Sequence, residues 1–140
     1  MTPEGQTIRE SGYGPKETMD RLEAAVARQG MTVLVRIDHA AAAADIGMAL
    51  RPTEVLIFGN PRAGTPLMQA APTMGIDLPL KALVWQDENG ATWLAHDDPK
   101  RLAGRHGADV GAGGTVLARM VEALRAVSSE ATHRETGEAS

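Results

Sequence analysis

The sequence contains no cysteine. Without thiols the chain forms no disulfide, offers no thiolate nucleophile and holds no metal through sulfur. This absence fits a reducing compartment, and we expect a cytoplasmic protein. No serine lies in a G-x-S-x-G nucleophile elbow, which removes the commonest interpretation of a small hydrolase.

Long apolar runs and an excess of basic residues are also missing. No apolar stretch approaches the ~20 residues of a membrane helix, and the opening residues MTPEGQTIRE carry no signal-peptide pattern. The net charge is −4 with both signs interspersed, so there is no basic stripe for a phosphate backbone. We therefore expect neither a membrane nor a nucleic acid as partner.

What is present indicates one globular domain. The chain has 140 residues, 43% of them hydrophobic, and a domain of this size buries roughly 70% of the surface of its unfolded chain. We predict a single α+β domain over residues 1–128. The polar residues 129–140 show no periodicity, and we expect them to form a disordered tail.

The order of predicted elements is β-α-β-α-β-α-β-β-α-α. Strands are expected over residues 7–11, 31–38, 53–59, 80–87 and 91–97, and helices after Pro15, at the alanine run 40–44, over 66–71, after Asp98 and after Thr115. The last two strands are joined through Asn89-Gly90, the strongest local hairpin signal, so they are antiparallel. These features favour an α+β fold: a mainly antiparallel sheet with helices packed on one face.

Several details of this prediction concern which side chains share a face. Residues 31–38 alternate, which places Met31, Val33, Val35 and Ile37 together on one face of a strand. The nearly continuous apolar run 53–59 predicts a central strand covered on both faces. Two tryptophans flank the hairpin, and the loop alternatives leave open whether they share a face.

The residues also carry a family resemblance. Ile37-Asp38-His39, the run from Arg51 into Phe58-Gly59-Asn60-Pro61, and Gly64-Thr65-Pro66-Leu67-Met68 are followed by Gly75-Ile76-Asp77-Leu78-Pro79-Leu80-Lys81 and a tryptophan-bearing hairpin. This pattern resembles the bacterial and archaeal family called domain of unknown function 302, over about residues 7–127. The resemblance implies a small fold similar to the TATA-box-binding-protein-like class, usually as a homodimer. It implies no established activity.

His39 is the strongest single candidate for a catalytic or ligand-binding side chain. It follows a strand and begins a helix, where the helix dipole disfavours the imidazolium and keeps the ring neutral. A neutral histidine there can act as a base, a hydrogen-bond donor or a ligand. The alternative is a cap-region histidine bonded to nearby backbone.

The segment Gly59–Thr65 has the G-x-x-x-x-G spacing of a phosphate loop, but Thr65 stands where the lysine belongs. A weaker anion site remains open, because a helix is expected to start next to it and Arg62 supplies charge. The alternative is turn geometry, with Asn60 bonding locally and Pro61 fixing the direction of the chain.

The other candidates are isolated. Lys81 leads a strand and offers one cation, and His96 can join His39 only if the fold brings them together. The four histidines share no metal-ligand spacing, so we expect neither metal nor cofactor. The methionines are interpreted as core residues rather than as a soft-metal site.

The leading hypothesis is a non-enzymatic homodimeric module that binds a small ligand or a protein, with a small anion as the candidate ligand. Its candidate ligand-binding residues are His39, Gly59, Asn60, Arg62, Thr65, Lys81 and His96. The alternative is a small enzyme in which His39 is a general base and Lys81 or Arg62 orients an anionic substrate. A third possibility is a purely structural partner of another protein.

Overall fold

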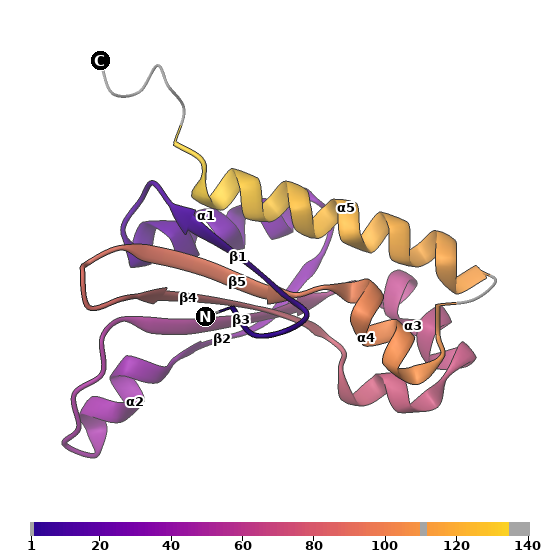
Figure 1. The fold of residues 1–140 in the computed structure, drawn as a ribbon, viewed down its shortest axis with the longest axis horizontal. Coiled ribbons are helices and arrows are strands. Elements are labelled where there is room, and N and C mark those ends of the chain that lie inside the picture. Colours follow the sequence, from indigo (N-terminus) through magenta and orange to yellow (C-terminus); the bar gives the residue numbers. More distant parts are fainter. Residues whose placement is uncertain (1, 110–111, 135–140) are drawn as a thin grey trace.

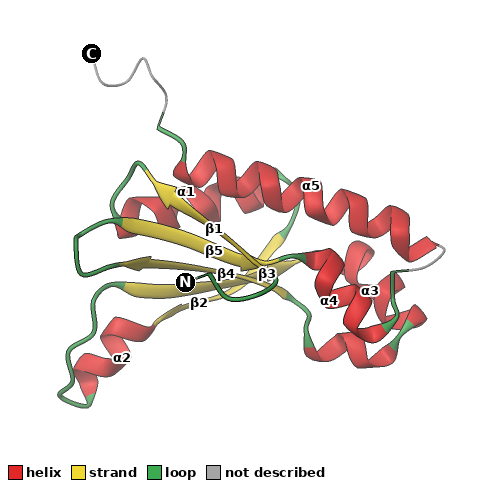
Figure 2. Ribbon diagram, in the orientation of Figure 1, coloured by secondary structure: helices red, strands yellow, loops and turns green. Residues whose placement is uncertain are grey.

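A five-stranded antiparallel sheet forms the centre of the computed structural model, which describes residues 2–109 and 112–134 (Figures 1 and 2). The strands are β1 (Gln6–Ser11), β2 (Thr32–Asp38), β3 (Thr53–Gly59), β4 (Leu80–Gln86) and β5 (Thr92–Asp97), in the spatial order β1-β5-β4-β3-β2. The helices are α1 (Pro15–Arg28), α2 (His39–Asp45), α3 (Pro61–Ala70), α4 (Pro99–His106) and α5 (Ala112–Thr132), with a 3-10 helix, η1 (Pro72–Ile76). The predicted α+β class and element order are confirmed.

The hydrophobic core lies between one face of the sheet and the helices α1 and α5, which run along that face (Figure 1). On α1 the buried residues recur at helical spacing, on the face toward the sheet. Fully buried side chains of this core include Met19, Leu22, Val26, Leu56, Phe58, Val84, Leu94, Leu124 and Val127. The short helices α3, α4 and η1 gather at one end of the sheet, and α2 lies beyond the other end (Figure 2).

No described helix covers the opposite face of the sheet (Figure 1), and most of the side chains on that face are apolar. The cross-strand pairs Leu83–Ala95 and Trp85–Trp93 lie on this face, because they alternate with the core pair Val84–Leu94. Its apolar residues are Ile8, Val35, Ile37, Val55, Ile57, Leu83, Trp85, Trp93 and Ala95, and we call them the open face. The expectation that residues 53–59 form a strand covered on both faces is therefore wrong for this chain.

A β-bulge corrects the predicted pattern of β2. The register with β3 shifts between Val33, which pairs with Phe58, and Val35, which pairs with Ile57. Val33 consequently packs on the core, whereas Val35 and Ile37 are on the open face. An inserted residue reverses the alternation from that point on, so the four apolar side chains do not share a face as expected.

The bulge also turns Arg36 toward α1. Its guanidinium forms two hydrogen bonds with Glu54, at 2.8 and 3.0 Å, and contacts Asp20 at 2.7 Å and Glu23 at 3.4 Å. These contacts raise the pKa of Arg36, chiefly through the hydrogen bonds with Glu54, so the ion cluster joins α1 to the edge of the sheet.

Two helices begin earlier than the sequence predicts. Helix α3 starts at Pro61 with Asn60 as its N-cap, so Pro66 lies inside the helix instead of starting it. Helix α5 already includes Ala112, so Thr115 is not its cap. Pro is favoured at the first turn of a helix, where Pro61 stands. The sequence prediction assigned that role to Pro66, which lies inside the helix.

Helix α5 also ends later than predicted. It continues to Thr132, and Ala131 and Thr132 are buried. The expected tail from residue 129 is wrong for these residues, because the last turn packs on the body of the domain. Residues 135–140 of that tail lie outside the described part of the chain. Among the described residues, no helix combines the length and apolarity needed to cross a bilayer.

Candidate functional site

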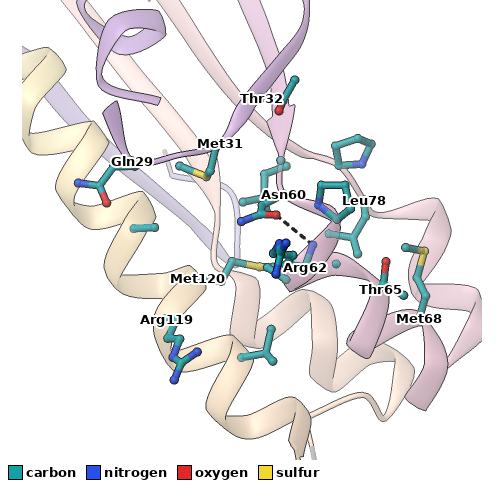
Figure 3. A pocket seen from close by; sticks show the side chains of 18 of the residues that line it. Gln29, Met31, Thr32, Asn60, Arg62, Thr65, Met68, Leu78, Arg119 and Met120 are labelled. Atoms are coloured by element: carbon teal, nitrogen blue, oxygen red, sulfur yellow. Dashed lines mark hydrogen bonds between the residues drawn. The ribbon is translucent and has the colours of Figure 1, made fainter. Parts of the chain in front are cut away.

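A cavity of about 620 Å³ opens at the end of the sheet where α3 and α5 meet (Figure 3). The start of β2, the end of β3 with the first turns of α3, the segment Leu78-Pro79-Leu80, and α5 form its walls. Its volume lies within the range of about 300–1,000 Å³ typical of small-molecule sites. The segment that follows Phe58 therefore borders a recess.

The cavity is apolar inside, and its polar lining residues are mostly at the exposed mouth, where Leu34 is also 58% exposed. Leu80, Gly64 and Met120 are buried in its floor and walls, and Met31 and Met68 are half-buried. The polar lining residues that are exposed are Gln29, Thr32, Arg62, Thr65 and Arg119. None of the described lining residues is Asp or Glu. The local charge at the mouth is thus positive although the whole chain is acidic.

Asn60 organises the wall that carries Arg62. Its side-chain Oδ1 accepts a hydrogen bond from the backbone N–H of Arg62 at 3.0 Å (Figure 3), and its carbonyl accepts from Ala63 and Gly64. The first free N–H groups of α3 are thereby used within the protein. Because Gly64 lies inside the helix, this segment is not a phosphate loop, and turn and cap geometry explain Gly59–Thr65.

The structure brings four of the seven candidate residues to this cavity: Gly59, Asn60, Arg62 and Thr65. His39, Lys81 and His96 do not line it. His39 is exposed at the start of α2, at the opposite end of β2 from the cavity (Figure 1). Strand β2 runs from Thr32 near the cavity to Asp38, a distance of roughly 20 Å at the rise of a strand, so His39 does not converge with Arg62.

Lys81 and His96 lie on different faces of the sheet. Lys81 pairs with Ile57 on the open face and is exposed. His96 pairs with Ala82 on the helix-covered face, and its Nδ1 lies 3.0 Å from the carbonyl of Asp97. The geometry that the enzyme hypothesis requires, with His39 next to Lys81 or Arg62, is therefore absent from the described structure.

Sequence reasoning missed the wall formed by α5. Val116, Arg119, Met120 and Ala123 line the cavity at i, i+3, i+4 and i+7 spacing, one face of the helix. An arginine within an otherwise apolar helical stripe is the signal that marks this wall. Arg119 is not among the seven candidate residues that the sequence indicated.

A second polar cluster joins η1 to α4. His106 Nε2 lies 2.5 Å from Asp77 Oδ2, and His106 Nδ1 lies 2.8 Å from Thr73 Oγ1. Arg105 approaches the same carboxylate at 3.5 Å. None of these residues lines the cavity. The cluster therefore serves as a structural contact between two helices. Among the described residues no group of three or more His, Asp or Glu side chains has a metal-binding arrangement.

These features define a small α+β domain with an antiparallel sheet. It has an apolar cavity with two arginines at its opening, and one face of its sheet is uncovered. The model of the family described as domain of unknown function DUF302 matches residues 7–127, and the chain belongs to this family. A crystal structure of an uncharacterised conserved DUF302 protein from Bacillus stearothermophilus has the same fold, with a TM-score of 0.79 and 23% identity. The alignment covers 92% of this chain and 99% of that one.

Curated relatives are longer proteins. The chain is 47% identical over 102 residues to the fluoride-specific ion channel FluC 1 of Brucella suis biovar 1 (strain 1330) and to FluC 1 of Brucella abortus biovar 1 (strain 9-941). The matched segment is 73% of this chain but only 40% and 38% of the two relatives. The similarity therefore concerns one part of those proteins.

Proposed function

We propose that this chain is a homodimeric, cytoplasmic binding module that takes a small ligand in the cavity between α3 and α5. The observation that carries the proposal is the cavity itself, about 620 Å³ with an apolar interior and a polar mouth. Convergent polar groups around an apolar recess are typical of ligand sites. Candidate residues Asn60, Arg62 and Thr65 stand at this mouth.

Thermal shift with a metabolite library tests the proposal. A ligand at a hundred times its dissociation constant stabilises the folded protein by ~2.7 kcal/mol. In Ala123→Leu the larger side chain enters the cavity, so the stabilisation by any hit should disappear. Ala118→Leu is the matched control, because Ala118 is an exposed residue of the same helix outside the cavity. Hits that A123L leaves unchanged, or no hits at all, would contradict the proposal.

The homodimer is supported by the apolar surface that the single chain leaves exposed. Val35 and Ile37 on the open face are 41% and 36% exposed. After α2, Ile46, Met48 and Leu50 are 73%, 63% and 49% exposed. Large apolar side chains left exposed in this way favour an interaction site, and a two-fold dimer places the same surface on both subunits. A second copy of this chain is the occupant we propose.

A second candidate function is association with a fluoride channel. The observation that favours it is the 47% identity over 102 residues to the two Brucella proteins named as fluoride-specific channels. A tagged version of this chain would be mixed with Brucella suis FluC 1 from which the matched segment has been removed. Co-purification with the shortened channel supports the proposal, and no more recovery than with an unrelated membrane protein refutes it.

A further inference from the structure

We propose that the ligand of the cavity is an amphipathic anion, with an apolar body inside and a carboxylate or phosphate group held at the mouth by Arg62 and Arg119. This inference rests on the proposed function, because it presupposes that the cavity binds a ligand. The juxtaposition behind it is an apolar interior with two arginines at its rim.

The interior suits a flexible apolar body. Leu80 and Met120 are only 5% and 6% exposed although they line the cavity. Met31, Met68 and Met120 contribute three of the wall side chains (Figure 3). Methionine is unbranched and adapts its shape to what it contacts. The cavity can therefore pack against chains or rings of different outline while it keeps water away from them.

The two arginines at the mouth differ from the five arginines of this chain that form ion pairs. Arg28, Arg36, Arg101, Arg105 and Arg125 each contact a carboxylate of the protein. Within residues 2–109 and 112–134, neither Arg62 nor Arg119 has an ion-pair partner. They come from opposite walls, α3 and α5 (Figure 3).

An unpaired guanidinium is suited to a carboxylate or phosphate group, because its planar fork donates two parallel hydrogen bonds to two oxygens. No described acidic residue of the lining competes for the two arginines. An approaching anion therefore meets a positive mouth on a chain whose net charge is −4. The charge complementarity is local and confined to this opening.

The same geometry disfavours a small inorganic anion. The first N–H groups of α3 are bonded to Asn60, so no backbone cradle is left for a bare phosphate. The positive groups are at the exposed rim, whereas the interior offers apolar walls. An ion at the rim alone would leave that interior in contact with water, and the apolar body supplies the affinity.

Titration calorimetry with octanoate, octanol and acetate tests the ligand class, at concentrations where octanoate is monomeric. Each titration is repeated on ¹⁵N-labelled protein to locate the binding site by NMR. We expect octanoate to bind at least tenfold more tightly than octanol, and acetate to bind too weakly to measure. The amide shifts should map to the residues around Asn60 and to the 116–123 face of α5.

Charge-removing variants test the role of the arginines. Arg62→Gln and Arg119→Gln should each weaken octanoate binding about tenfold, in line with the loss of a hydrogen bond to a charged group. Octanol binding should stay unchanged. Arg125→Gln is the matched control on α5, because Arg125 lies outside the cavity, and it should bind both probes as the wild type does.

Two results would overturn the inference in distinguishable ways. If octanol or acetate binds in the cavity as tightly as octanoate, or the arginine variants change nothing, the cavity binds a ligand but not an amphipathic anion. If no probe shifts the amides around the cavity while the library also yields no cavity ligand, the proposed function fails together with the inference.

Discussion

Two neighbouring glycines at the start of α5 differ in what a side chain would meet. A Cβ on Gly113 would lie 2.3 Å from the carbonyl oxygen of Ala108, whereas on Gly114 the nearest atom is the carbonyl oxygen of Asp109 at 3.8 Å. The first distance requires the backbone to move, and the second is an ordinary contact. Gly113 thus permits the close approach of α5 to the end of α4.

We expect Gly113→Ala to lower the free energy of unfolding by about 1–3 kcal/mol, the usual range for overpacking. Gly114→Ala, one position on, should raise it by up to about 1 kcal/mol, because alanine favours the helix. Urea denaturation of both variants measures the difference. Equal effects in the two variants would show that Gly113 is not closely packed.

At the residue scale, the sequence locates one wall of the candidate site and misses the other. Asn60, Arg62 and Thr65 were identifiable because a turn and a helix start follow an apolar strand within one short segment. Arg119 was not, because only the docking of α5 against α3 brings it to the same opening. His39 satisfied a local rule at a strand end, but the sheet carries it to the far end of β2.

The β4–β5 hairpin contains a hydrogen-bonded carboxylate, Asp87, whose contribution to stability should depend on pH. Asp87 accepts hydrogen bonds from the indole N–H of Trp93 at 2.8 Å and from the amides of Ala91 and Asn89. The pKa of this carboxyl is lowered from 3.8, chiefly by the bond from Trp93. A depressed folded-state pKa stabilises the protein above the unfolded value and loses that effect as pH falls through the folded value.

We therefore expect the wild type to exceed Asp87→Asn in stability at neutral pH, with the difference shrinking below pH 3.8. Urea titrations of both proteins across this range, followed by tryptophan fluorescence, measure it. A difference that is constant down to the acid limit, or that grows with acidity, would contradict the assignment of the Asp87–Trp93 bond.

The hydrogen bonds of His106 that connect α4 to η1 give a second prediction, which concerns the stability of this contact. The side chain of His106 is 8% exposed and bridges Asp77 and Thr73. His106→Ala should reduce stability by about 1–3 kcal/mol, because it leaves a half-buried carboxylate without its closest partner. Hydrogen exchange should rise in residues 72–77. His39→Ala is the control, since His39 is exposed, and it should stay within about 0.5 kcal/mol of the wild type. Equal losses of stability in the two variants would show that the contact of His106 with η1 does not stabilise the fold.

Elements with strong local signals were predictable, and those shaped by tertiary contacts were not. The helix expected after Asp98 forms as α4, with Asp98 as its cap, Pro99 in its first turn and the left-handed Gly107 at its end. The Asn-Gly hairpin also forms, and Trp85 directly opposes Trp93. By contrast, the bulge in β2 and the end of α5 depend on partners distant in sequence: Arg36 reaches α1, and Gly12 donates to the carbonyl of Thr132.

At the scale of the whole molecule, the proposed homodimer predicts the effect of charge on the exposed apolar surface. Ile37→Lys on the open face and Met48→Lys after α2 should convert the protein from twice 14.8 kDa to the monomer mass. Both positions are exposed in the single chain, so the subunit fold should survive. Light scattering after size-exclusion chromatography gives the mass, and circular dichroism checks the fold.

The matched control for this experiment is Ile76→Lys. Ile76 is 77% exposed and lies in η1, at the other end of the molecule from α2 (Figure 1). This variant should keep the mass of the wild type. A wild-type protein that is already monomeric at high concentration would remove the dimer from the proposal and leave the cavity unaffected.

The most direct measurement of the central claim is a crystal structure of the protein grown with octanoate. We predict electron density for one octanoate molecule in the cavity between α3 and α5. Its hydrocarbon should lie against Met31, Met68 and Met120, and its carboxylate should lie at Arg62 or Arg119. Density for the ligand on the open face alone, with the cavity filled by water or by a rearranged side chain, would contradict the claim that this cavity is the binding site.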